Sequence, residues 1–367
     1  MQHTLTDTTA IIKKALAGER LSLEEGALLY ERGDLEELRV AADSMRQRRH
    51  PEGLVTFLVD RNINYTNVCI IDCGFCAFYR KPASPEGYLL TNEQIGHKIE
   101  ELLAWGGTRI LLQGGVHPYL KLNYYVDLLH YIKERYPIQT DAFSPIEVQN
   151  IARIMKRPQV EILHDLHVAG MDGLPGGGAE ILDDHIRMQI SPHKGSWQEW
   201  INSMRLAQRE GMTTSATMVF GFGESVPERM QHLLRLRELQ DESIAYNGNG
   251  FTSFICWGYQ PENTRLGGQK VQGEEYLRMV ASARLLLDNF ANLSASWPSH
   301  GVDLAKQALH YGANDFGSTM MEENVVSAAG SGTGTCQSPQ TIIHHIQESG
   351  FQAAKRDSNY RVLERYA

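Results

Sequence analysis

Three cysteines within eight residues form the segment whose residue types and spacing most directly indicate chemistry. Cys69, Cys73 and Cys76 are separated by three and then by two residues. Three thiolates can hold three corners of a [4Fe-4S] cubane, whereas a bacterial ferredoxin segment brings a fourth cysteine after two-residue gaps. One iron would therefore stay open to another ligand. Structural zinc sites take four ligands, and the segment offers no fourth nearby, so zinc is the weaker alternative.

The other two cysteines do not obviously complete this group. The chain has 367 residues and five cysteines, an odd number that argues against a secreted disulfide framework. Cys256 falls in a predicted strand among apolar residues and is expected to be a buried small side chain. Cys336 lies on a flexible loop and has no evident partner. A non-catalytic iron-sulfur or zinc protein would need one of these two as a fourth ligand.

Composition and charge exclude several classes of function. Hydrophobic residues make up 42% of the chain and charged residues 22%, which is typical of a globular protein with a large core. The formal net charge of -9 provides no basic face for nucleic acid, so we expect no nucleic-acid partner. Residues 1–16 lack the apolar core of a signal peptide, and no run of about 18 apolar residues occurs. We therefore expect a cytoplasmic protein without membrane contact.

The elements that must position the cysteines have the pattern of a parallel α/β barrel. Short β-type runs alternate with segments of helical period, and capping boxes that begin at Thr91 and Ser196 mark two helix starts. Eight strands are predicted, at 63–68, 109–114, 138–143, 171–174, 213–220, 250–256, 292–297 and 313–316. We predict a (β/α)8 TIM-type barrel with a C-terminal helical extension at 55–367, after an N-terminal helical segment at 1–54.

The cysteine segment directly follows the first predicted strand. Its thiolates would then lie on a loop at the C-terminal end of the barrel, where barrel enzymes have their active sites. Gly114, Glu224 and Asn314 are likewise expected at the C-terminal ends of their strands. We expect all of them to surround one cavity together with the cysteines.

The cysteine spacing is the signature of the radical S-adenosylmethionine (SAM) superfamily, and its flanking residues resemble one branch of it. The flanks are Asn-Tyr-Thr-Asn-Val-Cys at 64–69 and Cys-Ala-Phe-Tyr-Arg at 76–80. That branch makes futalosine-derived menaquinone precursors and the deazaflavin chromophore of coenzyme F420. Within it the chain is most similar, over 55–360, to the cyclases that act on dehypoxanthine futalosine.

This resemblance implies the cofactors, the partners and the reaction. The cofactors are a [4Fe-4S] cluster on the three cysteines and SAM on its open iron, and a low-potential electron donor such as flavodoxin or ferredoxin supplies electrons. Cleavage of SAM leaves a 5'-deoxyadenosyl radical, which takes hydrogen from the sugar ring of dehypoxanthine futalosine. The carbon radical then attacks the benzoate ring, and loss of an electron and a proton completes the product.

The resemblance also implies SAM-binding residues near the cysteines and after the second strand. Phe75 lies within the cysteine segment. Gln113, Gly114 and Gly115 stand where the superfamily usually carries Gly-Gly-Glu to hold the SAM amino group, but Val116 replaces the acid. Of the contacts that this superfamily segment makes with SAM, the resemblance therefore implies only the backbone contacts for this chain. The glycines could equally form a tight turn between strand and helix.

A second glycine segment, after the fifth predicted strand, resembles the element that lines the adenosine pocket of many relatives. Gly221 and Glu224 keep their places in it, whereas Phe222 and Gly223 stand where close relatives usually have His-Val. A turn with a solvated Glu is the alternative. The segment 173–180, Gly-Leu-Pro-Gly-Gly-Gly-Ala-Glu, also matches the family, and its glycines would let backbone approach a ligand.

Residues near the end of the barrel sequence are candidates for the substrate site. The segments 316–318 and 323–326 resemble the cyclases more than their sister enzymes, aminofutalosine synthase and the deazaflavin chromophore synthase. Asn314, Asp315, Ser318 and Thr319 are polar and could contact substrate or cap a helix. Asp315, His300 and His193 are candidates, by chain position alone, for the group that accepts the proton.

Overall fold

The first barrel strand consists of two consecutive segments, and it joins the two edges of the sheet. The computed structural model describes residues 8–367, in which β1 (Leu54–Leu58) and β2 (Asp60–Asn64) are interrupted only at Val59. β1 pairs in parallel with β9, whereas β2 pairs in parallel with β3. A further parallel bridge joins Arg61 to Met321. The two edges of the sheet are therefore joined through this one run, and a barrel results.

The other barrel strands follow in chain order around the ring. The sheet order from β9 runs through β8, β7, β6, β5, β4 and β3 to β2, and every neighbouring pair is parallel. Within the described residues the predicted (β/α)8 architecture is confirmed. These strands are β3 (Arg109–Gln113), β4 (Gln139–Ala142), β5 (Gly173–Leu174), β6 (Thr213–Phe220), β7 (Phe251–Gly258), β8 (Asn292–Ser294) and β9 (Asp315–Ser318).

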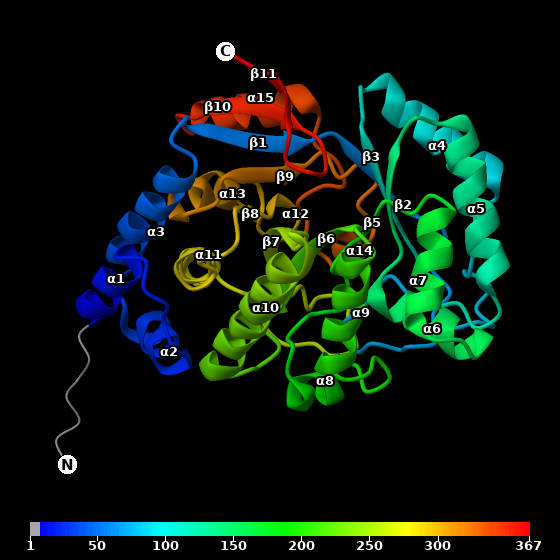
Figure 1. Cartoon of the computed structure of the whole chain (residues 1–367), viewed down its shortest axis with the longest axis horizontal. Helices are drawn as coiled ribbons and strands as arrows, with labels where there is room; N and C mark the ends of the chain where they lie inside the picture. The colour runs from blue at the N-terminus through cyan, green and yellow to red at the C-terminus, as the bar shows by residue number, and fades with distance from the viewer. Residues whose placement is uncertain (1–7) are drawn as a thin grey trace.

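Helices follow the strands and cover the outside of the barrel (Figure 1). The predicted capping boxes at Thr91 and Ser196 are present at the starts of α4 and α9. The helices are α4 (Asn92–Ala104), α5 (Leu122–Arg135), α6 (Pro145–Met155), α7 (Gln159–Val168), α8 (Asp184–Ile190), α9 (Trp197–Arg209), α10 (Val226–Asn247), α11 (Gly273–Leu286), α12 (Trp297–His300), α13 (Val302–Ala308) and α14 (Val325–Ala328), with a 3-10 turn, η1 (Leu309–Tyr311). Within the described part of the chain, none of the helices has the length and apolar character needed to span a membrane.

Both ends of the chain pack onto the barrel. At the start, α2 (Leu23–Arg32) and α3 (Leu35–Arg49) lie against α10 and α11, and α1 (Thr8–Leu16) packs on α2 and α3. Residues 1–7 of the predicted N-terminal segment lie outside the described part. At the end, α15 (Pro339–Glu348) is followed by β10 (Gln352–Arg356), parallel to β1, and by β11 (Val362–Arg365), antiparallel to β10 (Figure 1). α15 is a helical extension as predicted, and the two strands were not foreseen.

Three predicted strand positions are wrong. The first was predicted at 63–68, but β2 ends at Asn64, and 65–68 makes only isolated bridges. β1 was not predicted. All its residues are buried, so it lacks the alternation of apolar and polar residues that marks a strand with one buried face. β8 ends at Ser294, before Trp297 starts α12, and β9 begins at Asp315 instead of residue 313.

Candidate active site

A cavity of about 330 Å³ runs along the inside of the barrel. Asn64 and Gln113, the last residues of β2 and β3, line its upper part, which is the end where strands terminate. Arg109 and Thr213, the first residues of β3 and β6, line its lower part. The cavity therefore extends over the length of the strands. Arg356, Ser358 and Tyr360 of the C-terminal tail close the lower part.

The cysteine loop lies beyond the end of β2 and is braced by backbone hydrogen bonds to three other segments. Ile70 N-H donates to Val116 O (3.1 Å), and Gly74 N-H donates to Ile190 O at the end of α8 (2.9 Å). Leu266, from the loop between β7 and α11, donates to Gly74 O (2.9 Å). These partners all follow β3, β5 or β7 in the chain, so the loop is fixed at the upper end of the barrel.

The thiols of this loop fit a polynuclear cluster better than a single metal ion. A tetrahedral zinc with bonds of about 2.3 Å would hold its sulfurs about 3.8 Å apart. Among the described residues, the three cysteine sulfurs do not all lie within 4.8 Å of one another. Burial raises the pKa of Cys69, and raises that of Cys76 to about 11, so metal binding must release their protons.

The apolar residue in the glycine motif has a packing role. Val116, where the superfamily usually has an acid, is buried and packs against Ile71 and Cys73 of the cysteine loop. The glycines before it are required by close approach. A Cβ on Gly114 would lie 2.6 Å from the ring of Tyr65, and one on Gly115 would overlap the backbone of Val68.

A buried carboxyl group that sequence reasoning missed supports the same turn from α6. Glu147 is 1% exposed and accepts hydrogen bonds from the backbone N-H of Gly114 (3.2 Å) and from the hydroxyls of Tyr65 (2.6 Å) and Ser144 (2.6 Å). Burial raises the pKa of Glu147 to about 7 despite these bonds. A lone acid in the first turn of a helix gave no signal in the sequence, because its partners come from other elements.

The glycine loop after β5 brings an ion pair to the cysteine loop. Gly176, Gly177 and Gly178 line the cavity together with Glu180. Glu180 Oε1 accepts a hydrogen bond from Lys194 Nζ, whereas Oε2 has no partner among the described residues. Lys194 Nζ also lies 4.7 Å from the centre of the Phe75 ring. A carboxylate and an ammonium group therefore stand beside the proposed ligands.

The glycine segment after β6 is held by its own acid. Glu224 is buried and accepts hydrogen bonds from the backbone N-H groups of Gly221 and Phe222, both at 2.7 Å, and from Arg229 Nε at 2.7 Å. Its carboxylate thus fastens the turn. Phe222, which stands where relatives have another residue, packs against Phe75 with ring centres 5.4 Å apart.

The three side chains predicted to accept a proton are placed away from the cavity surface. Asp315 is buried and held by Arg356, at 2.6 Å and 3.0 Å, and by the hydroxyls of Thr56 and Ser294. His300 stacks on a neighbouring tyrosine ring, and burial lowers its pKa to about 4. His193 is exposed on the surface. Of the described residues that line the cavity, none is one of these three.

The expected grouping of Asn314 with the cysteines is wrong. Asn314 precedes β9 and bonds to Arg284 (2.7 Å) and to the backbone of Leu293 (3.0 Å), at the end where strands begin. Because β9 begins at Asp315, Asn314 lies before this strand, at the end of the barrel opposite to the cysteine loop. Ser318, at the end of β9, does line the cavity, whereas Thr319 bonds to the backbone of Asp60.

Known proteins are similar in sequence to most of this chain. Residues 63–236 match the radical SAM superfamily, and residues 248–366 match the CofH/MqnC C-terminal region. A cyclic dehypoxanthine futalosine synthase of Halalkalibacterium halodurans is 46% identical over 97% of this chain and 95% of its own. The chain belongs to the radical SAM superfamily and, within it, to the family of cyclic dehypoxanthine futalosine synthases.

Other relatives agree with this assignment. The synthase of the same name from Streptomyces coelicolor is 39% identical over 97% of this chain and 89% of its own. An aminodeoxyfutalosine synthase from Thermus thermophilus is less similar, at 36% identity over 96% of this chain and 94% of its own. A solved methylornithine synthase (PylB) shares the fold, with a TM-score of 0.73 and 19% identity over 94% of this chain and 97% of that chain.

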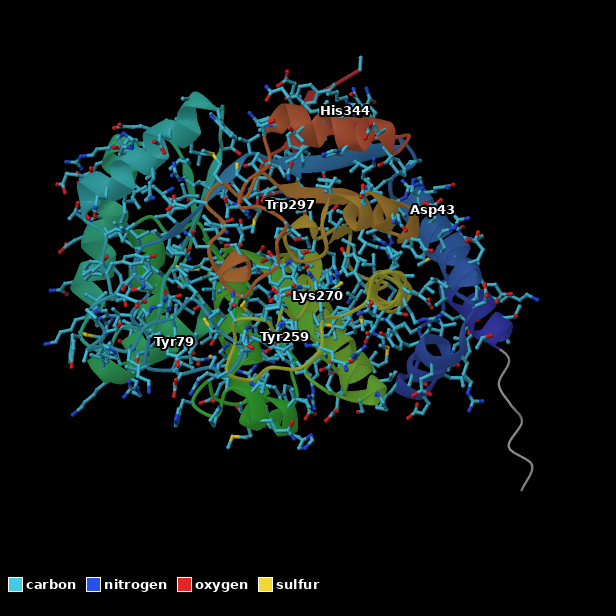
Figure 2. The ribbon with its side chains drawn as sticks, turned by 180° about the vertical axis from the view of Figure 1, so that it is seen from behind. Asp43, Tyr79, Tyr259, Lys270, Trp297 and His344 are labelled. Carbon is cyan, nitrogen blue, oxygen red and sulfur yellow. The ribbon has the colours of Figure 1, made fainter. Side chains whose placement is uncertain are left out.

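Aromatic side chains form part of the cavity wall. Tyr259 and Trp297 both line the cavity, and their labels fall toward the middle of the molecule in Figure 2. Tyr79 of the cysteine loop lies toward the edge of the same view. Phe222 packs between Phe75 and Tyr259, with ring centres 4.7 Å from the latter. Phe75, Phe222 and Tyr259 therefore form one aromatic cluster next to the cysteine loop.

Proposed function

We propose that this protein cyclises dehypoxanthine futalosine in menaquinone biosynthesis and that Cys69, Cys73 and Cys76 hold its [4Fe-4S] cluster. The observation that carries the proposal is a braced loop with three thiols at the mouth of a barrel cavity, in a chain 46% identical to such a synthase. The donor set fits the group, since three thiolates hold three corners of a cubane and leave the fourth iron free. When bound, the cluster and SAM supply a 5'-deoxyadenosyl radical.

The chain's own charged groups beside the cysteine loop suit the polar ends of SAM. Lys194 can pair with a carboxylate, and Glu180 Oε2 can accept a hydrogen bond from an ammonium group. Gly114 and Gly115 allow close backbone approach from the β3 side. In this proposal Glu180, reached from β5, supplies the negative charge that Val116 cannot.

The rest of the cavity suits a ribose-linked benzoate. Hydroxyl and amide side chains from several strands line it and can bond to sugar hydroxyls, while Trp257 and Trp297 can pack on an aromatic ring. The proposal further includes a low-potential electron donor such as flavodoxin or ferredoxin, a cytoplasmic location and a domain boundary near residue 54. The polar lining residues are Asn62, Thr217, Ser253, Ser294 and Ser318.

An anaerobic assay of the reconstituted enzyme tests this function. With dehypoxanthine futalosine, SAM and a low-potential reductant, we expect the cyclised product and 5'-deoxyadenosine, with deuterium transferred from the sugar carbon to 5'-deoxyadenosine. Turnover only with tyrosine or with the enolpyruvyl precursor of aminofutalosine would assign the chain to a sister activity. Cys73→Ala should lose the iron-sulfur absorption, whereas Cys336→Ala should keep it as the matched control.

A further inference from the structure

The cavity contains a small set of ionisable side chains, and the reaction needs one of them. A carbon radical that adds to an aromatic ring leaves one proton and one electron to be removed before aromaticity returns. The ring proton therefore requires an acceptor inside the cavity. Among the described residues, the ionisable side chains that line it are Arg109, Asp141, Glu180, Tyr259, Glu323, Arg356 and Tyr360.

Most of these groups are unsuited to accept a proton. The two arginines are cations, and burial raises the pKa of Tyr259 and of Tyr360, so the phenols keep their protons. Glu323 caps α14 and accepts three backbone hydrogen bonds of 2.7 Å to 2.8 Å. Glu180 is paired with a lysine beside the cysteine loop. Asp141 remains.

Asp141 is buried yet only loosely held. Its Oδ1 accepts a hydrogen bond from Gln139 Nε2 at 3.1 Å, and its Oδ2 accepts one from Arg109 at 3.3 Å. Both contacts are long for hydrogen bonds to a carboxylate. Gly173 on the neighbouring strand leaves room for this group, because a Cβ there would overlap Asp141 Oδ1. The carboxylate thus has capacity for a proton without breaking a strong bond.

The charges around Asp141 also favour proton uptake. Asp60, Asp141 and Asp315 face Arg109 and Arg356 at the lower end of the barrel, three carboxyl groups against two guanidinium groups. On the outer side, Asp172 adds a further negative charge and is itself paired with Lys133. One carboxylate is therefore left without a full counter-charge. Burial raises the pKa of Asp141 accordingly.

We propose that Asp141 is the catalytic residue that accepts the ring proton after cyclisation, which rests on the function proposed above. The C-H bond at the attacked ring carbon breaks, and its proton goes to a carboxylate oxygen of Asp141. The electron pair of that bond stays in the ring. One electron then leaves to a one-electron acceptor, the oxidised iron-sulfur cluster, and the ring is aromatic again.

The test uses full-length reconstituted enzyme and substrate that carries deuterium on the sugar carbon. Asp141→Asn keeps the shape and the acceptor oxygen but cannot take up the proton. We expect product formation to fall about 10²-fold or more, a typical loss for a proton-transfer group. Radical formation should continue. Because the unproductive radical takes hydrogen back from 5'-deoxyadenosine, protium should replace deuterium in the recovered substrate.

Two further variants make the result decisive. Asp172→Asn removes a neighbouring charge outside the cavity. It should keep the wild-type ratio of cyclised product to 5'-deoxyadenosine and should show no deuterium loss from the recovered substrate. Asp141→Glu restores a carboxylate and should recover part of the product. An Asp141→Asn enzyme that makes product within threefold of wild type overturns the inference. So does an equal loss of product and 5'-deoxyadenosine in both Asp141 variants without deuterium loss. A wild-type enzyme that makes no cyclised product rejects the proposed function instead.

Discussion

Glu147 provides a test of the electrostatics behind the cysteine loop, because its buried carboxyl group should make stability depend on pH. The pKa of Glu147 is raised from 4.5 to about 7 by burial in the folded protein. Between these values the Glu147 carboxyl binds more protons in the folded state than in the unfolded state, so its contribution to stability is greatest at low pH and falls as pH rises towards 7. The contribution of Glu147 alone should fall by about 2.5 kcal/mol between pH 5 and pH 8, at 1.36 kcal/mol per pKa unit.

The substitution Glu147→Gln should remove this loss. Gln keeps an oxygen that can accept from Tyr65 and Gly114, and its amide can donate to Ser144. We compare the free energies of unfolding of the variant and of wild type, measured in urea. The advantage of the variant over wild type should be about 2.5 kcal/mol larger at pH 8 than at pH 5.

A second variant gives the control. Tyr65→Phe removes a hydrogen bond that favours the ionised form of Glu147, so its pKa should rise further and the pH-dependent loss should extend above pH 7. The reasoning is refuted if the unfolding free energies of wild type and Glu147→Gln differ by the same amount at pH 5 and at pH 8.

Three other substitutions test packing and charge in the same way. Gly114→Ala should cost about 1 to 3 kcal/mol of unfolding free energy in urea, because the new Cβ would meet the ring of Tyr65, and SAM binding by calorimetry should weaken with it. Glu224→Ala should cost about 3 kcal/mol by the same assay, since it leaves two backbone donors without an acceptor and removes one of the two carboxylate partners of the buried Arg229. A loss below 1 kcal/mol would contradict the assigned role. Arg356→Met should cost about 3 to 5 kcal/mol of unfolding free energy in urea, because it leaves the Asp315 carboxylate buried without its cationic partner, and a loss below 1 kcal/mol would contradict this pairing.

Prediction succeeded for the fold where the signal is local and failed where it depends on pairing. Capping boxes at Thr91 and Ser196 were correct because both partners lie within one helical turn. The alternation of strands and helices correctly indicated a barrel. β1 escaped notice because a strand buried on both faces has no alternation, and β9 was misplaced by two residues because register is decided by neighbouring strands.

For the site, the sequence by itself determined the group of three cysteines, Cys69, Cys73 and Cys76. Their spacing can be recognised within eight consecutive residues, without knowledge of the fold. Only the tertiary structure decided which other groups join it. Closure of the barrel brings Lys194 to Phe75, Glu147 to Gly114 and Asp141 into the cavity, while Asp315 is turned towards the C-terminal tail. These neighbours come from different elements, and their contacts depend on strand register and on burial. Neither quantity is encoded in the spacing of any one segment.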